Sequence, residues 1–413
     1  MRKQSLTKPK LTTRTFALNG FSNNTSLAVN FTTDEYLILT GAKSLMFGYV
    51  PEQINQVVKV DQTYFFISKN AVKYQFDGSY FTTVPVYGPE TPLLLSVMKD
   101  GKKEIVAINK EGARFLSDIK TVFDVPYGER CLVLWGRLFI ANGKNLYFGG
   151  PFNFSDASVR LENQGFISFG YEDGNIVGLC AFVNELIVLT ERAIYKLTLS
   201  DDDFIMEKAN LPPLNIQKDT VVGFGDRVIF VNDNHLCEYK KGGLVIADGI
   251  FNSSGFICNG KAVKNVRNYI LPIYDKNNQN LLYIRDVATG AEKVVSSFSN
   301  VVGDGGLIVD TEGRKLYLLD DEGDYQDSGV WESKSFDFGV SNKKTLIEIS
   351  LYVSKDALLT VKGDFGERKY ALKAGHVIKR INLYSRSFVF LLTSAQTGFY
   401  ARDMKLKYRV TGE

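Results

Sequence analysis

Histidine is the side chain most often used for catalysis and metal binding at neutral pH, and this sequence contains only two. His235 lies in a predicted hairpin, and His376 opens a predicted strand far along the chain. There is no H-E-x-x-H, C-x-x-C or G-x-S-x-G segment and no glycine-rich phosphate-binding loop, so the common zinc, serine-hydrolase and nucleotide sites lack their motifs. We therefore expect both histidines to be structural and the protein not to be an enzyme.

Two acidic clusters are the remaining candidates for metal binding or hydrolysis. They are Asp201–Asp203 and Asp320–Asp324. Neither has the alternating oxygen ligands of a calcium loop, so we expect solvated loops and neither metal nor cofactor. Carboxylates brought together from separate strands could still hydrolyse a glycosidic bond, and a hydrolase therefore stays an alternative.

The composition favours a β-sheet protein with a sizeable core. Of the 413 residues, 45% are hydrophobic, and the 29 Phe and 21 Tyr suit a pleated, half-buried surface. No stretch approaches the roughly 18 continuous apolar residues of a membrane helix, so we expect no membrane span. The cysteines lie in or beside apolar runs without paired spacing, which predicts reduced core residues. They are Cys131, Cys180, Cys237 and Cys258.

A pair of short apolar runs separated by a turn recurs along the first 330 residues. Successive pairs start about 39 residues apart on average, close to the roughly 40–50 residues of a propeller blade. The eight pairs are Glu35–Phe47, Thr63–Phe76, Lys103–Leu116, Arg137–Phe148, Glu185–Leu197, Arg227–Tyr239, Asn268–Arg285 and Gly306–Leu319.

These hairpins predict a β-propeller, because stacking blades around an axis covers faces that an isolated hairpin leaves exposed. We expect six to eight blades, with seven the best estimate; a run of separate sandwiches is the alternative. With seven blades, we expect one of the eight hairpins either to close the ring or to belong elsewhere. Asn142-Gly143 is predicted to form the two centres of a type I′ turn.

The pattern changes after residue 330, where longer alternating strands predict one compact β-sandwich. From Trp331 to Glu413 there are 15 Lys and Arg against 8 Asp and Glu, so this part is basic. The predicted domains are an extended N-terminal arm (1–30), a propeller (31–330) and the sandwich (331–413). The predicted strands of the sandwich are Thr345–Val353, Ala357–Lys362, Arg368–Leu372, His376–Leu383, Ser387–Thr393 and Ala401–Arg409.

Basic side chains in the arm and the sandwich are the candidates for docking to a partner or facing DNA. A lysine-rich solvated surface is the alternative for each of them. The candidate residues are Arg2, Lys3, Lys8, Lys10, Arg14, Lys343 and Lys344.

The order of motifs resembles the propeller-bearing tail proteins of short-tailed bacteriophages, the tail nozzle or packaged-DNA-stabilising group. The stretches that carry the resemblance are Phe16–Asn30, Arg137–Asp156 running into Gly165–Leu197, and Trp331–Gly339. The resemblance implies a virion protein that assembles in the host cytoplasm. It further implies a homo-oligomeric ring, expected to be sixfold, which contacts portal-adaptor or other tail proteins and surrounds non-specifically bound DNA.

We therefore consider three alternative functions, in order of preference. The first is a structural phage tail protein at the tube or nozzle. The second is a propeller that binds a ligand such as a host glycan or a partner protein. The third is a propeller hydrolase, which would need two carboxylates in one pocket.

Overall fold

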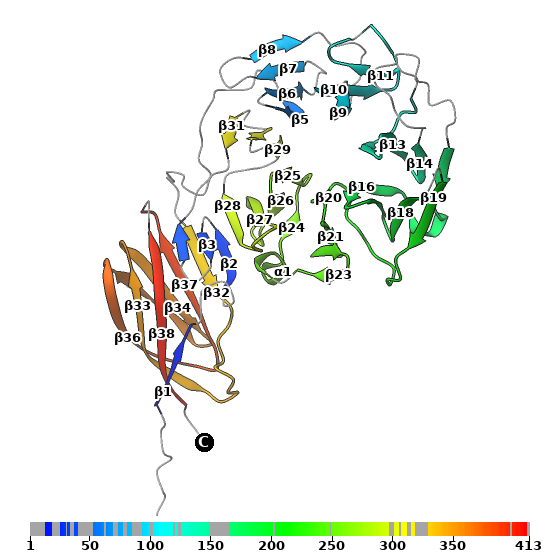
Figure 1. The fold of residues 1–413 in the computed structure, drawn as a ribbon. Helices are drawn as coiled ribbons and strands as arrows, with labels where there is room; N and C mark the ends of the chain where they lie inside the picture. The colour runs from blue at the N-terminus through cyan, green and yellow to red at the C-terminus, as the bar shows by residue number, and fades with distance from the viewer. Residues whose placement is uncertain are drawn as a thin grey trace, which may run out of the picture.

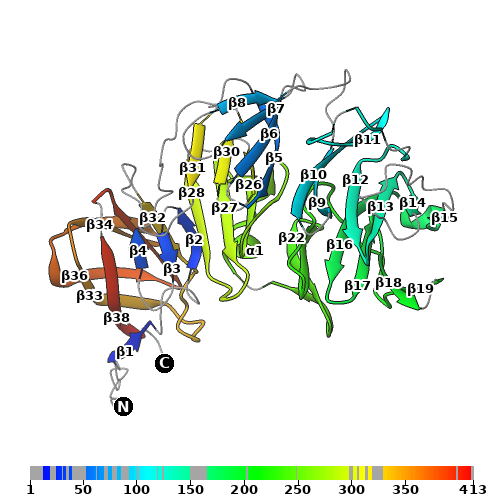
Figure 2. The same ribbon diagram turned by 45° about the horizontal axis from the view of Figure 1, so that its top comes forward.

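The computed structural model consists of small antiparallel β-sheets arranged in two units (Figures 1 and 2). Seven sheets follow one another around a ring, and the C-terminal strands form a second unit beside it. The structure describes residues 13–18, 25–29, 31–33, 37–39, 53–61, 63–68, 73–76, 81–84, 93–99, 102–118, 120–122, 125–148, 165–200, 203–247, 249–296, 301–304, 307–311, 315–318, 329–396 and 399–410.

The seven sheets of the ring are consecutive in the chain, and we number them as blades 1 to 7. Blade 1 comprises β5 (Ile54–Val60), β6 (Thr63–Ser68), β7 (Lys73–Phe76) and β8 (Phe81–Val84), and blade 2 comprises β9 (Leu93–Lys99), β10 (Lys102–Asn109) and β11 (Gly112–Phe115). Blade 3 comprises β12 (Arg130–Leu134), β13 (Arg137–Asn142), β14 (Asn145–Phe148) and β15 (Gly165–Ser168), and blade 4 comprises β16 (Ile176–Phe182), β17 (Glu185–Thr190), β18 (Ile194–Ser200) and β19 (Asp203–Lys208). Blade 5 comprises β20 (Val222–Gly223), β21 (Arg227–Asn232), β22 (His235–Lys240) and β23 (Gly243–Ile246). Blade 6 comprises β24 (Ile257–Cys258), β25 (Val263–Asn265), β26 (Asn268–Tyr274), β27 (Asn280–Asp286) and β28 (Glu292–Ser296), and blade 7 comprises β29 (Val301–Asp304), β30 (Leu307–Asp310) and β31 (Lys315–Leu318).

The ring closes through the inner strands of the blades. The strands β5, β9, β12, β16, β20, β25 and β29 each contact the next, and β29 contacts β5. A buried apolar cluster fills each interface between neighbouring blades. At the closing interface Leu307 packs with Ile54 and Phe66, and the backbone N–H of Lys59 donates a 2.8 Å hydrogen bond to the Asp304 carboxylate. The described sheets therefore form a closed seven-bladed propeller, which confirms the predicted fold class.

Seven of the eight predicted hairpins are the second and third strands of the seven blades. The first, Glu35–Phe47, differs. Its described part, β4 (Leu37–Leu39), pairs with β3 (Phe31–Thr33) and with β38 (Tyr400–Val410) of the second unit. This hairpin therefore belongs elsewhere, and the seven that remain match the seven blades.

The turn predicted at Asn142-Gly143 is shifted by one residue. Asn142 pairs in register with Asn145, so the two central residues are Gly143 and Lys144, and Gly143 has a φ of 56°. Glycine at the first centre fits a type II′ turn rather than the predicted type I′. The turn after β21 has positive φ at both centres, 47° and 62°, as type I′ requires.

Helices are short in the described residues. The helix α1 (Ile250–Ser254) lies between β23 and β24, and the 3₁₀ turn η2 (Tyr171–Asp173) precedes β16. Ile250 and Phe251 of α1 are buried in the core between blades 5 and 6. Among the described residues, no helix has the length and apolar character needed to cross a bilayer.

All four cysteines are free thiols in apolar surroundings. Burial raises the pKa of Cys131, Cys180 and Cys258 to about 12, and that of Cys237 to about 11. The thiolate is the reactive form, and its fraction falls tenfold for each unit that the pKa rises above the ambient pH. At pH 8 we expect the folded protein to react with a maleimide roughly 100- to 1000-fold more slowly than a free thiol. Mass spectrometry should find four modified thiols in denaturant, and rapid modification of all four under native conditions would contradict the burial.

The second unit is a sandwich of two sheets with an apolar core. Its C-terminal strands are β32 (Gly329–Ser333), β33 (Lys344–Val353), β34 (Ala357–Gly363), β35 (Gly366–Leu372), β36 (Gly375–Ser385), β37 (Phe388–Ser394) and β38. One sheet contains β38, β33 and β36, and the other has the order β32-β37-β34-β35. Trp331, Phe390 and Leu406 are among the fully buried side chains between them. The predicted sandwich is therefore present.

The N-terminal segment completes both sheets of the sandwich. The strand β1 (Thr13–Ala17) pairs with β38, and β2 (Thr25–Val29) pairs with β32. The strand β3 also pairs with β28 of blade 6, so one sheet runs from the propeller into the sandwich. The expectations of an extended arm over 1–30 and of a propeller beginning at 31 are therefore corrected. The first described blade begins at Ile54, because β1, β2 and β4 pair with strands of the sandwich and β3 joins β4 to blade 6.

Candidate polyanion-binding face of the sandwich

The predicted docking residues in the N-terminal segment are only partly described. Arg2, Lys3, Lys8 and Lys10 lie outside the described residues. Arg14 lies on β1, opposite Tyr408 of β38, and its side chain is exposed. Arg14 thus lies on the outer edge of the sandwich sheet that contains β38.

Lys343 and Lys344 are adjacent but have opposite environments. The ammonium of Lys343 lies 5.3 Å from the centre of the Phe365 ring, a cation–π distance. Lys344 is fully buried, and its ammonium donates hydrogen bonds to the backbone oxygens of Asn342 (2.8 Å) and Arg386 (2.5 Å). Burial lowers the pKa of Lys344. Lys344 therefore anchors the start of β33, and its prediction as a docking residue is wrong.

A different set of cations lies on the outward side of β38. Lys405, Lys407 and Arg409 point away from the sandwich, whereas Leu406 and Tyr408 between them are buried. Alternate residues of a strand are about 6.8 Å apart on one side of the sheet. The strand therefore presents a regular row of positive charges. This alternation was visible in the sequence, but the sequence interpretation used it only to predict a strand.

The row continues across the sheet. Glu348 of β33 is in register with Lys407 of β38 on one side and with Arg380 of β36 on the other, so its carboxylate lies on the same face between two cations. The side chain of Arg380 is exposed. We call Arg380, Lys405, Lys407 and Arg409 the basic face. Among the described residues, none of these four cations forms an ion pair.

Aromatic side chains lie at one end of the basic face. The guanidinium of Arg402 lies 4.9 Å from the centre of the Tyr352 ring. Tyr352 stacks on Tyr400 at 5.7 Å between ring centres and meets the edge of His376 at 5.5 Å. Cations beside aromatic rings are the arrangement that contacts phosphates and bases of single strands. The two histidines lie in different units, since His235 is in blade 5.

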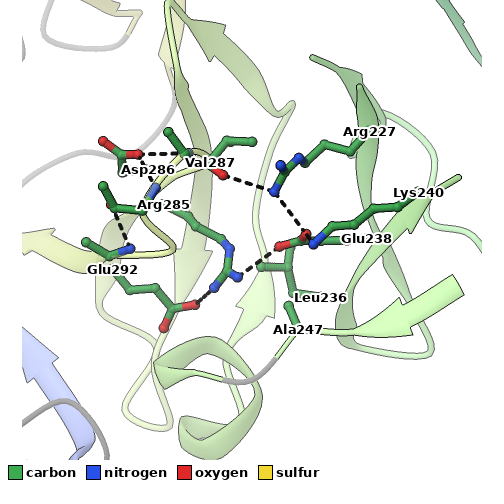
Figure 3. A network of polar contacts seen from close by, with 12 residues as sticks. Arg227, Leu236, Glu238, Lys240, Ala247, Arg285, Asp286, Val287 and Glu292 are labelled. Atoms are coloured by element: carbon green, nitrogen blue, oxygen red, sulfur yellow. Dashed lines mark hydrogen bonds and ion pairs between the residues drawn. The ribbon is translucent and has the colours of Figure 1, made fainter. Parts of the chain in front are cut away.

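Blades 5 and 6 are joined by a buried ion-pair network that sequence reasoning missed (Figure 3). The guanidinium of Arg285 on β27 donates to Glu292 of β28 at 2.5 Å and to Glu238 of β22 at 2.8 Å. Lys240 lies 2.5 Å from the other oxygen of Glu238. Burial alone would raise the pKa of Glu238, but Lys240 and Arg285 hold it below its usual range. The residues of the network come from two blades, so no local sequence pattern predicts it.

The network bears on the hydrolase alternative. Glu238 and Glu292 are two carboxylates from different blades, but Arg285 lies between them and both are buried. Glu292 also accepts a hydrogen bond from the Tyr283 hydroxyl at 2.6 Å and one from the Ile250 backbone N–H. Carboxylates neutralised and bonded in this way hold neighbouring elements together, and they do not present the free acid and base of a glycosidase.

The acidic clusters singled out in the sequence are mostly outside the described residues. Asp203 begins β19, whereas residues 201–202 and 320–324 are not described. Across the described ranges, no three His, Cys, Asp or Glu side chains are grouped so that they could hold a metal ion.

The sequence matches no protein-family model, and no curated protein matches it significantly. Among solved structures it is similar to the designed Ika8 protein (TM-score 0.42, 8% identity, 68% of this chain and 100% of that one). It is also similar to the Pan2 WD40 domain of Neurospora crassa (TM-score 0.40, 7% identity, 66% of this chain and 90% of that one). A third similar structure is that of a Mycobacterium tuberculosis puromycin-hydrolyzing peptidase (TM-score 0.44, 8% identity, 71% of this chain and 62% of that one). Similarities this weak say nothing about activity.

Proposed function

We propose that this protein is a non-enzymatic structural component of a bacteriophage tail, at the tube or nozzle, and that its basic face contacts the DNA backbone. The sequence resemblance to short-tailed phage tail proteins supports the tail role. The observation that carries the DNA contact is the basic face, where four outward cations on one sheet surround the single carboxylate of Glu348 and form no ion pair among the described residues. The proposed location is the virion.

The charge arrangement favours a polyanion over a small ligand. Four separated cations on a flat sheet face cannot all reach one small anion, whereas a phosphate backbone offers charges at successive positions. Contacts of this kind carry no sequence information, which suits DNA that passes a tail channel. In the proposed assembly, copies of the chain form a ring, expected to be sixfold, attached to the portal-adaptor or other tail proteins.

The DNA contact predicts a strong dependence of binding on salt. Four phosphate contacts give a slope of about −3.6 in log K against log salt, so affinity should fall about 100-fold between 50 and 200 mM salt. Exchanging all four basic-face residues for glutamine should remove most of this slope. Fluorescence anisotropy with a labelled duplex at several NaCl concentrations measures both quantities.

The matched control removes four cations from the other sheet of the sandwich. Lys362, Arg368, Lys369 and Lys373 are exposed there. Their exchange for glutamine changes the net charge equally and should leave the slope almost intact. If both variants lose the same part of the salt slope, the effect depends only on net charge, and the basic face is not the DNA-binding surface. The ring is tested separately by light scattering and negative-stain microscopy, and a monomer at high concentration would contradict it.

A further inference from the structure

A cavity of about 190 Å³ lies where the inner parts of six blades meet. Its lining comes from β5, β9, β12 and β16 and from the segments that precede β20 and β25. Inner strands of six different blades can converge only on the propeller axis. The cavity is therefore axial, and it is far larger than the roughly 10–15 Å³ that one water needs.

Two carboxylates and two cations line the cavity, and they are Glu129, Asp219, Arg130 and Lys261. Arg130 of β12 forms a 2.7 Å ion pair with Asp219, and the lining residue Glu129 forms a 2.9 Å ion pair with Lys218. Lys261 also lines the cavity, and among the described residues it has no ion-pair partner. Among the described residues, Lys261 is therefore the lining cation that no carboxylate holds in an ion pair.

Two further features indicate that this cation is held for a ligand. The Nε of Arg130 is buried and has no hydrogen-bond partner among the described residues. The side chain of Lys261 keeps an exposed surface, yet desolvation by the surrounding protein and the charge of Arg130 lower its pKa, while Asp219 raises it. A neighbouring negative charge would favour the charged form of this lysine.

We propose that the axial cavity binds a small oxyanion, a carboxylate or phosphate group, between Lys261 and Arg130. Lys261 supplies an ammonium that forms no ion pair among the described residues, and Arg130 supplies planar N–H donors while Asp219 fixes its orientation. This site lies in the propeller and does not depend on DNA binding by the sandwich.

The test uses the full-length protein with inorganic phosphate and, separately, acetate as probes. Calorimetric titration at constant ionic strength should show saturable binding of at least one of them. Lys261→Met should weaken that binding about 10- to 100-fold, as expected for losing a hydrogen bond to a charged group. Lys261→Arg keeps the charge and should keep binding. Lys276→Met, on an exposed loop of the same blade, is the matched control and should bind as the wild type does.

A second readout separates a ligand site from a structural lysine. Without added anion, Lys261→Met should unfold at the same temperature as the wild type or higher, because a cation that is repelled by Arg130 and forms no ion pair is removed. Phosphate or acetate should raise the unfolding temperature of the wild type but not of this variant. Binding of phosphate alone, acetate alone or both supports the site and identifies the preferred group. No saturable binding to the wild type, or equal binding to Lys261→Met, overturns it.

Discussion

Replacing Glu292 with alanine is expected to destabilise the protein by about 3–5 kcal/mol, the cost of breaking a buried ion pair by removing one partner. The change leaves Arg285 buried with Glu238 as its remaining carboxylate partner in the network. It also deprives the Tyr283 hydroxyl and the Ile250 backbone N–H of their acceptor. The junction of blades 5 and 6 and the start of α1 should loosen together. Urea unfolding followed by circular dichroism measures the loss.

The matched control is Glu367→Ala, which removes an exposed carboxylate 3.2 Å from Lys369. An exposed pair contributes about 0–1 kcal/mol, so this variant should unfold almost as the wild type does. If Glu292→Ala costs no more than Glu367→Ala, the network does not hold the blades together.

The same network predicts sensitivity to acid. Interactions with Lys240 and Arg285 depress the folded-state pKa of Glu238 below its unfolded value. Its contribution to stability is therefore fully present above the unfolded pKa of about 4.3 and is lost as the pH falls through the folded pKa. Glu238→Gln should show a smaller loss of stability between neutral and acid pH than the wild type. Parallel pH profiles would contradict this role.

Trp331→Ala is expected to cost about 3–5 kcal/mol and to weaken the propeller as well as the sandwich. Trp331 is fully buried on β32, between β2 and β37. One buried cluster includes Trp331 of the sandwich and Phe251 and Tyr283 at the interface of blades 5 and 6. The sheet from β28 through β3 and β4 to β38 also crosses between the units. We therefore expect the two units to unfold as one cooperative structure.

The sequence provides its own reporter for this experiment. Its only other tryptophan, Trp135, lies at the turn between β12 and β13 in blade 3. In Trp331→Ala the fluorescence change therefore reports the propeller alone, and its transition should move to lower denaturant. Phe365→Ala, which removes an exposed aromatic from the sandwich, is the control and should leave the transition nearly unchanged. An unshifted Trp135 transition in Trp331→Ala would mean that the units unfold independently.

Local patterns predicted the strands well. The six predicted sandwich strands agree with β33 to β38 to within two residues at each end. Seven predicted hairpins are the central strands of the blades, because alternation and turn residues are local properties of a strand pair. The errors arose where local pattern and tertiary contact disagree. Lys344 looks like a surface lysine in the sequence, but backbone oxygens of the sandwich take up its ammonium.

The sequence by itself determined the all-β class, the blade interval and the position of most strands, since each depends on residues a few positions apart. Only the tertiary structure decided that the N-terminal strands complete the sandwich, that Arg285 joins two carboxylates from different blades, and that Lys261 faces an axial cavity. These features depend on pairing between segments up to several hundred residues apart. Such pairing is selected by the burial of whole sheets around a common axis, and it leaves no periodic trace in any one segment.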